Sequence, residues 1–350
     1  MRFYSIRRNY GCMRVFITGA TGVLGRRLVE QLTNNGHDVV GLVRDADGET
    51  AVANRGGTPR YGDVLEPESL DAAMDDGIEV VIHAATAIPE STKPSEAEWA
   101  HNDRVRMEGA KNVLSKLPDS VEQFLLPSVV WLARQPDGSV FDETAERHPD
   151  RATQSLAELE ALLLNRAGES TVDAAILRCG FFYAPDARDT LTWGKQLLDG
   201  DLPIVGGGLL GRRDAELSVV HVDDAARAFV AAIEQEASGM YHIVDDEPVT
   251  PATLFTAFAE RLDAPDPGRI PGWLARFFIG KVTAKVMTHP MPTTNEKAAR
   301  ELDWEPTYPT YREGLDQIID QWERDGTLAE LRSDTPVEAV PSVDTAASSS

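Results

Sequence analysis

Three glycines near the start of the chain have the spacing of a dinucleotide-binding turn. Gly19, Gly22 and Gly25 form a Gly-x-x-Gly-x-x-Gly pattern in the segment RVFITGATGVLG, residues 14–25. Positions without side chains allow a tight turn, let a pyrophosphate approach the main chain, and let the following helix pack on its strand. The N–H groups at the start of that helix would then bind the phosphates. The pattern therefore predicts a dinucleotide site, with a ligand-free glycine turn as the alternative.

Arg44 and Asp63 bear on which dinucleotide binds and on how its adenine is held. Arg44 follows the apolar run 37–43. An acidic residue at such a position binds the ribose 2′-hydroxyl, whereas an arginine can hold a 2′-phosphate. The sequence therefore favours NADP, and NAD stays the alternative because an arginine at a strand end is common on protein surfaces. Asp63 stands where such folds place a carboxylate near the adenine amino group, unless it is a capping or loop aspartate.

A regular alternation of strands and helices must hold these residues in place. Apolar runs at 15–17, 80–86, 124–131 and 174–178 alternate with helical stretches at 26–32, 99–117 and 152–167. This alternation predicts an α/β fold with a doubly wound parallel sheet of Rossmann type, whose ligand crevice lies at the carboxyl ends of the strands. We expect His83 to be a core histidine of its strand. Pro127 implies a bulge or a sheet edge.

The chain divides into a nucleotide-binding part and a smaller, partly interleaved C-terminal part. We expect an N-terminal extension at 1–12, a Rossmann domain at 13–180, and a substrate-binding part at 181–330, of which 216–245 returns to the Rossmann sheet. Residues 331–350 lack a core-forming pattern and are expected to form a disordered tail. Met13 directly precedes the first strand and is the alternative start to Met1.

Composition restricts the partners and the compartment. The 57 acidic and 34 basic residues give a net charge of −23, which argues against nucleic acid as a partner. An acid-rich, lysine-poor surface is typical of salt-loving microbes, in which charge keeps proteins soluble. No apolar run reaches the roughly 18 residues of a membrane span. Cys12 and Cys179 give neither a disulfide framework nor metal-ligand spacing, so we expect a cytoplasmic protein without a metal.

Six segments, taken in order, make the chain resemble a known family. They are TGATGVLG (18–25), VIHAAT (81–86), GAKNVL (109–114), LRCGFFYAP (177–185), VVHVDDAARAF (219–229) and NEKAARELDWEPTYPTYREGL (295–315). Over residues 14–324 they resemble the NAD-dependent epimerase/dehydratase family of the extended short-chain dehydrogenases/reductases. The resemblance implies an NAD(P)-dependent oxidoreductase or epimerase acting on a small carbonyl or sugar-like substrate, nucleotide sugars included.

The acid/base pair of that family is missing. Members use a tyrosine, a lysine four residues later, and a serine or threonine on the preceding strand, and the lysine lowers the tyrosine pKa. Alignment on Glu160 puts Ala152 at the tyrosine position and Leu156 at the lysine position. No tyrosine or lysine lies between Lys116 and Tyr183. The chain therefore resembles an atypical branch, and the alternative to an enzyme is a non-catalytic NADP-binding sensor or assembly protein.

Two residues are candidates to replace the lost catalytic groups. Ser128 lies on the strand that carries the family's hydroxyl, although the best register puts Val129 at that position and a turn or cap role is the alternative. Tyr183 lies in a segment that the family places near the nicotinamide, with packing as the alternative. Arg106 also departs from the family, which usually has an asparagine three residues before Gly109.

The glycine pattern and the resemblance together give a set of cofactor-binding candidates. The set is Gly19, Thr21, Gly22, Val23, Leu24, Gly25, Arg44, Asp63, Val64, Ala84, Ala85, Thr86 and Phe181. The family often pairs through a four-helix interface, so a homodimer would use 99–117 and 152–167, with the apolar face of the second helix between subunits. Residues 267–295 contain no acid, and we expect a helix over the substrate cleft there or a surface for a membrane or partner.

Overall fold

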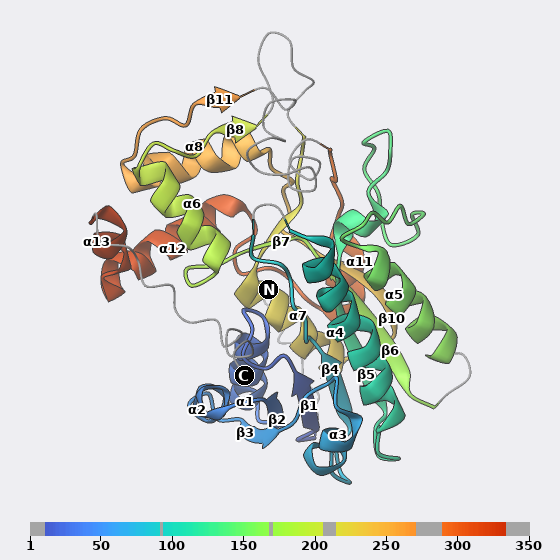
Figure 1. The fold of residues 1–350 in the computed structure, drawn as a ribbon. Helices are drawn as coiled ribbons and strands as arrows, with labels where there is room; N and C mark the ends of the chain where they lie inside the picture. Colours follow the sequence, from blue (N-terminus) through green and yellow to red (C-terminus); the bar gives the residue numbers. More distant parts are fainter. Residues whose placement is uncertain (1–10, 92–93, 168–170, 206–214, 271–288, 334–350) are drawn as a thin grey trace, which may run out of the picture.

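A central sheet of parallel strands organises the computed structural model, which describes residues 11–91, 94–167, 171–205, 215–270 and 289–333. Within these ranges the sheet has seven strands in the order β10-β6-β5-β4-β1-β2-β3, all paired in parallel (Figure 1). The strands are β1 (Arg14–Thr18), β2 (Asp38–Val43), β3 (Thr58–Tyr61), β4 (Val80–His83), β5 (Gln123–Val129), β6 (Asp173–Cys179) and β10 (Gly239–Ile243). The predicted Rossmann-type parallel sheet is confirmed, and its order reverses between β1 and β4, where such folds bind ligands.

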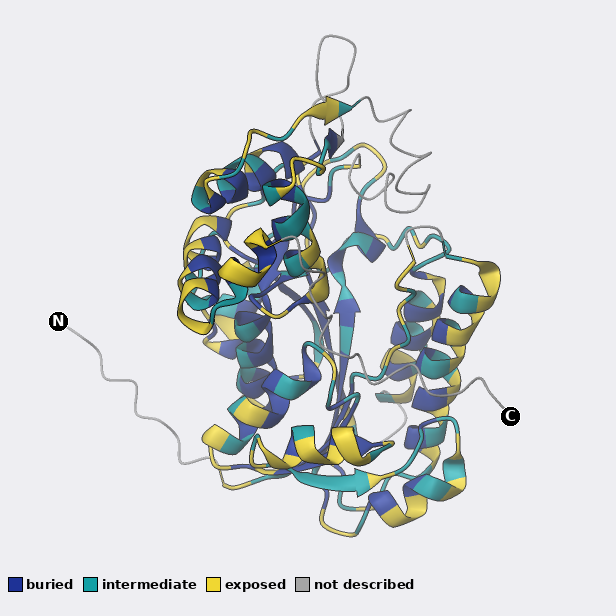
Figure 2. Ribbon diagram, turned by 60° about the vertical axis from the view of Figure 1, so that its left-hand side comes forward, coloured by how far each residue is buried: buried dark blue, intermediate teal, exposed yellow. Residues whose placement is uncertain are grey.

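Helices cover both faces of the sheet. On one face lie α1 (Gly25–Asn34), α2 (Ala46–Ala53) and α7 (Val222–Glu234), and on the other lie α3 (Pro67–Ala73), α4 (Glu96–Ser115) and α5 (Gln154–Ala167). Successive side chains of a strand point to opposite faces, so Val15 and Ile17 pack with α1 and α7 while Phe16 packs with α4 and α5. Figure 2 shows buried residues along the central strands and exposed ones on the outer surfaces of the helices.

The C-terminal part adds two small sheets and a group of helices beyond the strand ends. In the described residues β7 (Phe181–Tyr183) pairs with β9 (Val219–His221), and β8 (Ile204–Val205) pairs with β11 (Arg269–Ile270). The helices of this group are α6 (Arg188–Leu198), α8 (Pro251–Leu262), α12 (Tyr311–Asp325) and α13 (Thr327–Arg332). Helix α11 (Glu296–Leu302) packs instead on β10 and α7, in the core of the seven-stranded sheet. Within the segment 216–245, β10 is a strand of the seven-stranded sheet and α7 packs on one face of that sheet. Strand β9 pairs with β7 instead.

The expected start of the C-terminal tail needs correction. Helix α13 continues to Arg332, and Leu331 is 1% exposed in the core of the C-terminal part. Leu328 and Leu331 are both buried and lie three residues apart, so they form one apolar side of this short helix. That side holds residues 331 and 332 in the fold. Residues 334–350, like 1–10 and the greater part of the acid-free window 267–295, lie outside the described residues.

Pro127 occupies neither a sheet edge nor a bulge, contrary to expectation. Strand β5 is central, and Pro127 is in register with Leu177 of β6. On its other side β5 pairs with β4 only as far as Leu125, opposite Ile82, because β4 ends at His83. The proline therefore lies beyond the ladder between β4 and β5, where its missing N–H group costs no hydrogen bond to β4. This arrangement leaves residues 127–129 projecting past β4 at the carboxyl end of the sheet.

The apolar face of α5 is covered within the chain and not by a second subunit. Leu156, Leu159 and Leu163 are 4%, 0% and 2% exposed, and the last two pack in the core with α4 and the sheet. Leu164 is 39% exposed, so it is the large apolar residue of this helix that remains at the surface. A homodimer through α4 and α5 thus stays a prediction, and it would have to use their outer faces.

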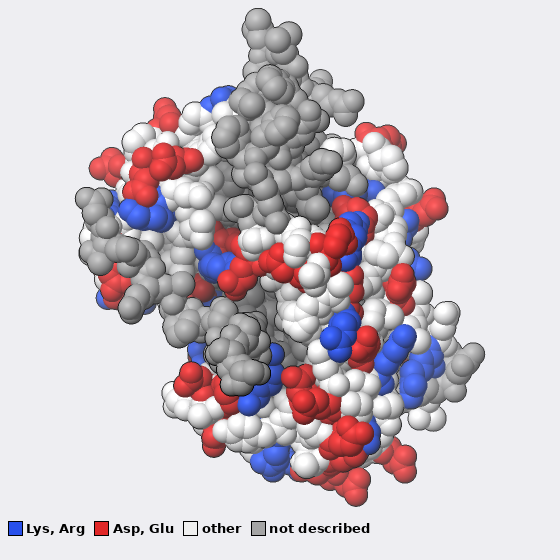
Figure 3. Space-filling model, viewed as in Figure 1, with Lys and Arg blue, Asp and Glu red and all other residues white. Residues whose placement is uncertain are grey.

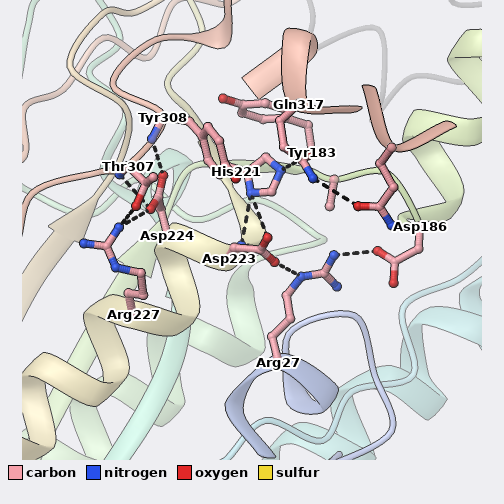
Figure 4. A network of polar contacts seen from close by, with 12 residues as sticks. Arg27, Tyr183, Asp186, His221, Asp223, Asp224, Arg227, Thr307, Tyr308 and Gln317 are labelled. Atoms are coloured by element: carbon pink, nitrogen blue, oxygen red, sulfur yellow. Dashed lines mark hydrogen bonds and ion pairs between the residues drawn. The ribbon is translucent and has the colours of Figure 1, made fainter. Parts of the chain in front are cut away.

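A polar network joins the two parts of the chain at the ends of α1 and α7 (Figure 4). Arg27 in α1 forms ion pairs with Asp223 at the start of α7 and, at 2.6 Å, with Asp186 in the loop after β7. His221 caps α7 by accepting from the Asp223 N–H at 3.2 Å, and its Nε2 lies 3.1 Å from Gln317 of α12. Burial lowers the pKa of His221, which is 0% exposed. These contacts give His221 a structural role at the junction of the two parts.

On the face drawn in Figure 3, acidic and basic side chains lie interspersed among uncharged residues. Many of the basic residues are engaged in ion pairs, as Arg312 is with Glu247 at 2.6 Å. Among the described helices none combines the length and the hydropathy that crossing a membrane requires.

Candidate active site

The glycine turn between β1 and α1 has one open face. A Cβ on Gly19, whose φ is +68°, would lie 2.6 Å from the Ala84 carbonyl oxygen, and a Cβ on Gly25 would overlap the Gly19 carbonyl. At Gly22 the nearest atom would be 3.4 Å away, and this residue is exposed. Close packing thus explains two of the glycines, whereas the third leaves main chain open at the N-terminus of α1. An anion such as a pyrophosphate fits this surface.

The segment after β4 lies directly against the glycine turn. The Ala84 N–H donates to the Thr18 carbonyl at 3.2 Å, and the Ala85 N–H donates to the Thr18 hydroxyl at 3.3 Å. Ala84 and Ala85 are half-buried and Thr86 is exposed. Small side chains here keep the floor of the crevice low where the sheet order reverses, as the sequence predicted for the position beneath a dinucleotide.

His83 is buried beneath this floor. It is 2% exposed, and its Nδ1 lies 2.9 Å from the Thr18 hydroxyl. Burial lowers the pKa of His83 to about 4, so the ring is neutral at pH 7. The histidine therefore serves the core, and it is no source of protons for the crevice.

Acid should weaken the fold through this buried ring. The folded pKa of about 4 lies below the ordinary value of 6.5, so the stabilisation is complete above 6.5 and is lost as pH falls toward 4. One pKa unit corresponds to about 1.4 kcal/mol, which makes the total effect on the order of 3 kcal/mol. We expect the difference in free energy of unfolding between wild type and His83→Gln to shrink from pH 7 to pH 4.5 in urea titrations. A constant difference would contradict this assignment.

The adenosine-side candidates gather at the ends of β2 and β3. Arg44 is exposed directly after β2. The next residue, Asp45, caps α2 by accepting from the Gly48 N–H at 2.8 Å, and a Cβ on Gly48 would lie 3.4 Å from the Thr21 methyl group. The residues after β2 are thus brought beside the glycine turn, where a 2′-phosphate would need a cation.

The other adenosine-side and turn candidates differ in exposure. Asp63 accepts from the Leu65 N–H at 2.8 Å, as in a loop aspartate, and is half-buried. Val64 is 7% exposed, and its carbonyl accepts from Asn112 at 2.8 Å. Leu24 is 6% exposed whereas Val23 is half-buried. Val64 and Leu24 therefore offer little side-chain surface to a ligand, and contact with them would involve main-chain atoms.

Two stacked aromatic rings, Trp131 and Phe181, lie beyond the ends of β5 and β6 and are called the aromatic wall here. Trp131 and Phe181 are stacked with ring centroids 4.3 Å apart and planes 4° from parallel, and both are half-buried. Trp131 lies in the short 3-10 helix Val130–Ala133 that follows β5, and Phe181 opens β7 after β6. Phe181 is one of the cofactor-binding candidates from the sequence, and the stack provides an apolar surface at this end of the strands.

Ser128 is not available as a catalytic hydroxyl, contrary to its candidacy. It is 4% exposed, and its hydroxyl donates to Glu160 Oε1 at 2.6 Å. Glu160 also binds Arg178 through two bonds, from Nε at 2.9 Å and from Nη2 at 2.7 Å. The ion pair between Glu160 of α5 and Arg178 of β6 is thus buried, and the serine on β5 donates a further hydrogen bond to its carboxylate.

Tyr183 faces the C-terminal core and not the crevice, which corrects its candidacy as well. It is 2% exposed, its hydroxyl donates to Asp245 at 2.7 Å, and its ring fills the space left by Gly314 of α12. Burial, followed by the Asp245 carboxylate, raises the pKa of Tyr183 well above its ordinary value. A phenol so placed holds its proton and cannot reach a substrate at the strand ends.

The start of α5 holds the two residues that the alignment on Glu160 places at the family's acid/base positions. The helix begins at Gln154, so Ala152 lies in the preceding turn, and Leu156 is 4% exposed. The Ala152 carbonyl accepts from Arg106 Nη1 at 3.1 Å. The structure therefore brings Arg106 to this point, a residue that the sequence marked only as a departure from the family's asparagine.

Comparison with known proteins establishes the relationship. The model of the NAD dependent epimerase/dehydratase family matches residues 15–244, which include the glycine turn, the crevice floor and β10. The chain belongs to the NAD-dependent epimerase/dehydratase family. A family defined by its dependence on NAD supports a nicotinamide dinucleotide as the cofactor.

Relatives in this family carry the names of reductases. The chain is 34% identical over 315 residues to a 3-diazoavenalumate denitrifying reductase from a Streptomyces species, covering 87% of this chain and 99% of that protein. It is 29% identical over 262 residues to a ketoreductase of a farnesylated dihydroquinoline oxide from Stigmatella aurantiaca, covering 71% and 73%. Family and relatives together support an NAD(P)-dependent oxidoreductase.

Solved structures share the fold at low identity. A human epimerase family protein with NADPH superposes with a TM-score of 0.73 at 16% identity, over 88% of this chain and 99% of that one. The UDP-glucose 4-epimerase of Thermus thermophilus with NAD gives 0.71 at 22% identity, over 89% and 99%. This likeness extends the epimerase-family fold to the C-terminal part, beyond the residues that the family model matches.

Proposed function

We propose that this protein is an NADP(H)-dependent reductase of a small electrophilic substrate, a carbonyl or a diazo compound, and that no side chain at the family's tyrosine position supplies the proton. The observation that supports it is the combination of an open glycine turn and a half-buried aromatic wall with Ala152 and Leu156 at the acid/base positions. The cofactor-holding residues would be Gly22, the main chain of 23–25, Arg44, and Ala84 to Thr86. Bound NADPH would supply the hydride.

The missing acid restricts the acceptors that this site can reduce quickly. A carbonyl that receives a hydride also needs a proton on its oxygen, and here water or the substrate itself must provide it. Loss of general acid catalysis costs about 10²–10⁴ in rate. An acceptor that is already protonated or cationic avoids this loss, because its hydride adduct is neutral. The relative named for a diazo substrate fits such chemistry, since an aryldiazonium group takes up one hydride and leaves as N₂ while the aryl carbon keeps the hydrogen.

Turnover measurements test this proposal. NADPH oxidation at 340 nm would be followed with ketones, aldehydes, nucleotide sugars and aryldiazonium salts, each against the non-enzymatic rate. We expect diazonium or activated ketone reduction to exceed that of simple ketones by about 10²-fold or more. Fastest turnover of nucleotide sugars would contradict the choice of substrate class.

A second candidate is a dinucleotide-binding assembly or sensor protein. It is favoured by the absent tyrosine and lysine, and by 31% identity over 132 residues, 37% of this chain, to a photosystem II assembly factor of Synechocystis. Binding of NADPH without turnover of any substrate class would support it over the reductase.

Arg44 should set the preference between the two dinucleotides. Arg44 directly follows β2, and the residues after it lie beside the glycine turn, where a 2′-phosphate would be held by charge-assisted bonds. We expect Arg44→Glu to weaken NADPH binding about 10- to 100-fold, the range for a lost charged hydrogen bond, and to change NADH binding little. Titrations of both nucleotides, followed by their fluorescence, measure the ratio. An unchanged ratio would mean that the protein does not use Arg44 to select NADP.

A further inference from the structure

Arg106 is a buried guanidinium with too few partners. It is 7% exposed in α4, where its Nη1 donates to the Ala152 carbonyl at 3.1 Å. Its Nε is shielded from solvent and has no partner among the described residues. Burial lowers the pKa of Arg106 to about 10, which shows how poorly its charge is compensated.

The described residues provide no carboxylate in ion-pair contact with Arg106. Asp103 acts on it by its charge, but the Asp103 carboxylate accepts from Arg151 at 2.7 Å. Arg151 binds Glu96 as well, at 2.8 Å. A buried cation without an anion is strongly unfavourable, so the retention of this charge calls for an anion that the chain itself lacks.

Further unsatisfied polar groups lie on α4 and on its neighbour α5. Asn102 precedes Arg106 by four residues on the same face of α4, and its buried Nδ2 has no partner in the described part of the chain. In α5, which packs on α4, the hydroxyl of Ser155 is likewise buried and unpartnered. All three groups can donate hydrogen bonds. Together they match a ligand group that carries several acceptor oxygens.

This polar cluster of Asn102, Arg106 and Ser155 adjoins the elements of the crevice. Asn102 Oδ1 accepts from the N–H of Ala87, which directly follows the crevice floor, at 3.0 Å. The segment leading to Ala152 runs beside the turn that carries Trp131, since the His148 N–H donates to the Leu132 carbonyl at 2.8 Å. The cluster is thus linked to the end of the crevice floor through Asn102, and to the segment beside Trp131 through the Ala152 carbonyl that Arg106 binds.

We propose that Arg106, with Asn102 and Ser155, binds a carboxylate of the substrate, and that the substrate is an aryl carboxylate whose ring lies against Trp131 and Phe181. This inference rests on the proposed function and names the substrate class for the same site. The positive charge that the family carries on α5, where this chain has Leu156, is thus provided from α4.

Binding of acids and their amides to the NADPH complex tests the assignment. Acetate, benzoate and trans-cinnamate would be compared with acetamide, benzamide and cinnamamide, by quenching of bound NADPH fluorescence and by melting temperature. We expect at least one aryl acid to bind about 10-fold or more tighter than its amide, the effect of one charged hydrogen bond. Arg106→Met should remove this difference while leaving the affinity for NADPH unchanged.

Two further variants sharpen the comparison. Arg104→Met is the matched control, because Arg104 lies on the same helix and its ion pair with Glu108 is exposed. It should retain the preference for the acid. Arg106→Gln, which keeps a donor toward Ala152 without the charge, decides the matter should the methionine variant fail to fold, and it too should lose the preference.

Several results would overturn the proposal. If the wild-type protein binds NADPH but prefers no acid to its amide, the role of Arg106 is refuted while the proposed function stands. A preference that survives in Arg106→Met or Arg106→Gln does the same, and weakened NADPH binding in these variants would assign the guanidinium to the cofactor. Protein that does not bind NADPH refutes the proposed function, and this inference with it.

Discussion

Replacing Gly22 by alanine is expected to weaken NADPH binding about 100-fold while leaving the melting temperature of the free protein unchanged. The added methyl group would meet nothing closer than 3.4 Å, so the fold has room for it. It would instead stand on the open face of the turn, where phosphate oxygens reach the N–H groups of α1. Charge-assisted hydrogen bonds lost there contribute about 1.5–3 kcal/mol each. Thermal unfolding with and without NADPH measures both quantities.

The matched control for this prediction is Gly25→Ala. Its methyl group would overlap the Gly19 carbonyl, so this variant should lower the melting temperature even without nucleotide. The two glycines thus separate a binding role from a packing role within one turn. Equal losses of stability in both variants would show that Gly22 serves packing as well. Unchanged NADPH affinity in Gly22→Ala would place the dinucleotide elsewhere.

Replacing Glu160 by methionine should destabilise the fold by about 3–5 kcal/mol, the usual result of leaving one charge of a buried pair alone. Glu160 and Arg178 are 0% and 1% exposed and share two hydrogen bonds. Removal of the acid leaves the guanidinium buried beneath α5 without an anion. The free energy of unfolding in urea at pH 7 gives the loss.

A double-mutant cycle separates the pair from its packing. Glu160→Met combined with Arg178→Met should recover most of the stability, because neither charge then remains buried. Ser128→Ala should cost only about 1 kcal/mol, as one neutral donor is lost. The exposed pair Arg104 and Glu108 provides the comparison, and breaking it should change stability by less than about 0.5 kcal/mol. Additive losses across the Glu160 and Arg178 variants would show that the pair is not coupled.

The fold could be predicted from the sequence because its signals are local. The spacing of Gly19, Gly22 and Gly25 and the alternation of apolar runs with helical stretches lie within short segments, and they indicate a parallel sheet without knowledge of distant contacts. The same holds for the small residues 84 and 85 on the crevice floor. These features follow from backbone geometry, which the residue type at each position restricts strongly.

The catalytic candidates failed because the direction of a side chain depends on distant partners. Ser128 was assigned to the crevice, but Glu160 in α5 takes its hydroxyl. Tyr183 turns into the C-terminal core because Gly314 leaves room for its ring and Asp245 accepts a hydrogen bond from its hydroxyl. A glycine inside a helix is a weak signal of such close packing, and it gains meaning only when the facing residue is known.

The importance of Arg106 was also beyond the sequence alone. Its departure from an asparagine was visible, but its burial and its contact with the Ala152 carbonyl appear only when α4 and α5 are packed together. Substituted positions on two neighbouring helices can compensate for one another in space while lying 50 residues apart in the chain.

The interleaving of the two parts constrains how this chain can be made. The core that contains Val15 and Leu28 also contains residues of α7 and β10 and the ring of Trp304, whose Nε1 donates to the Asp224 carbonyl at 3.1 Å. A ribosome must therefore release α7, β10 and Trp304 from its exit tunnel before the core on this face of the sheet is complete. Until residues 222–234 have emerged, α1 lacks the helix that packs on it, and nascent chains are exposed to chaperones and proteases at that side. A gene fragment that stops at residue 180 would encode this unfinished intermediate permanently.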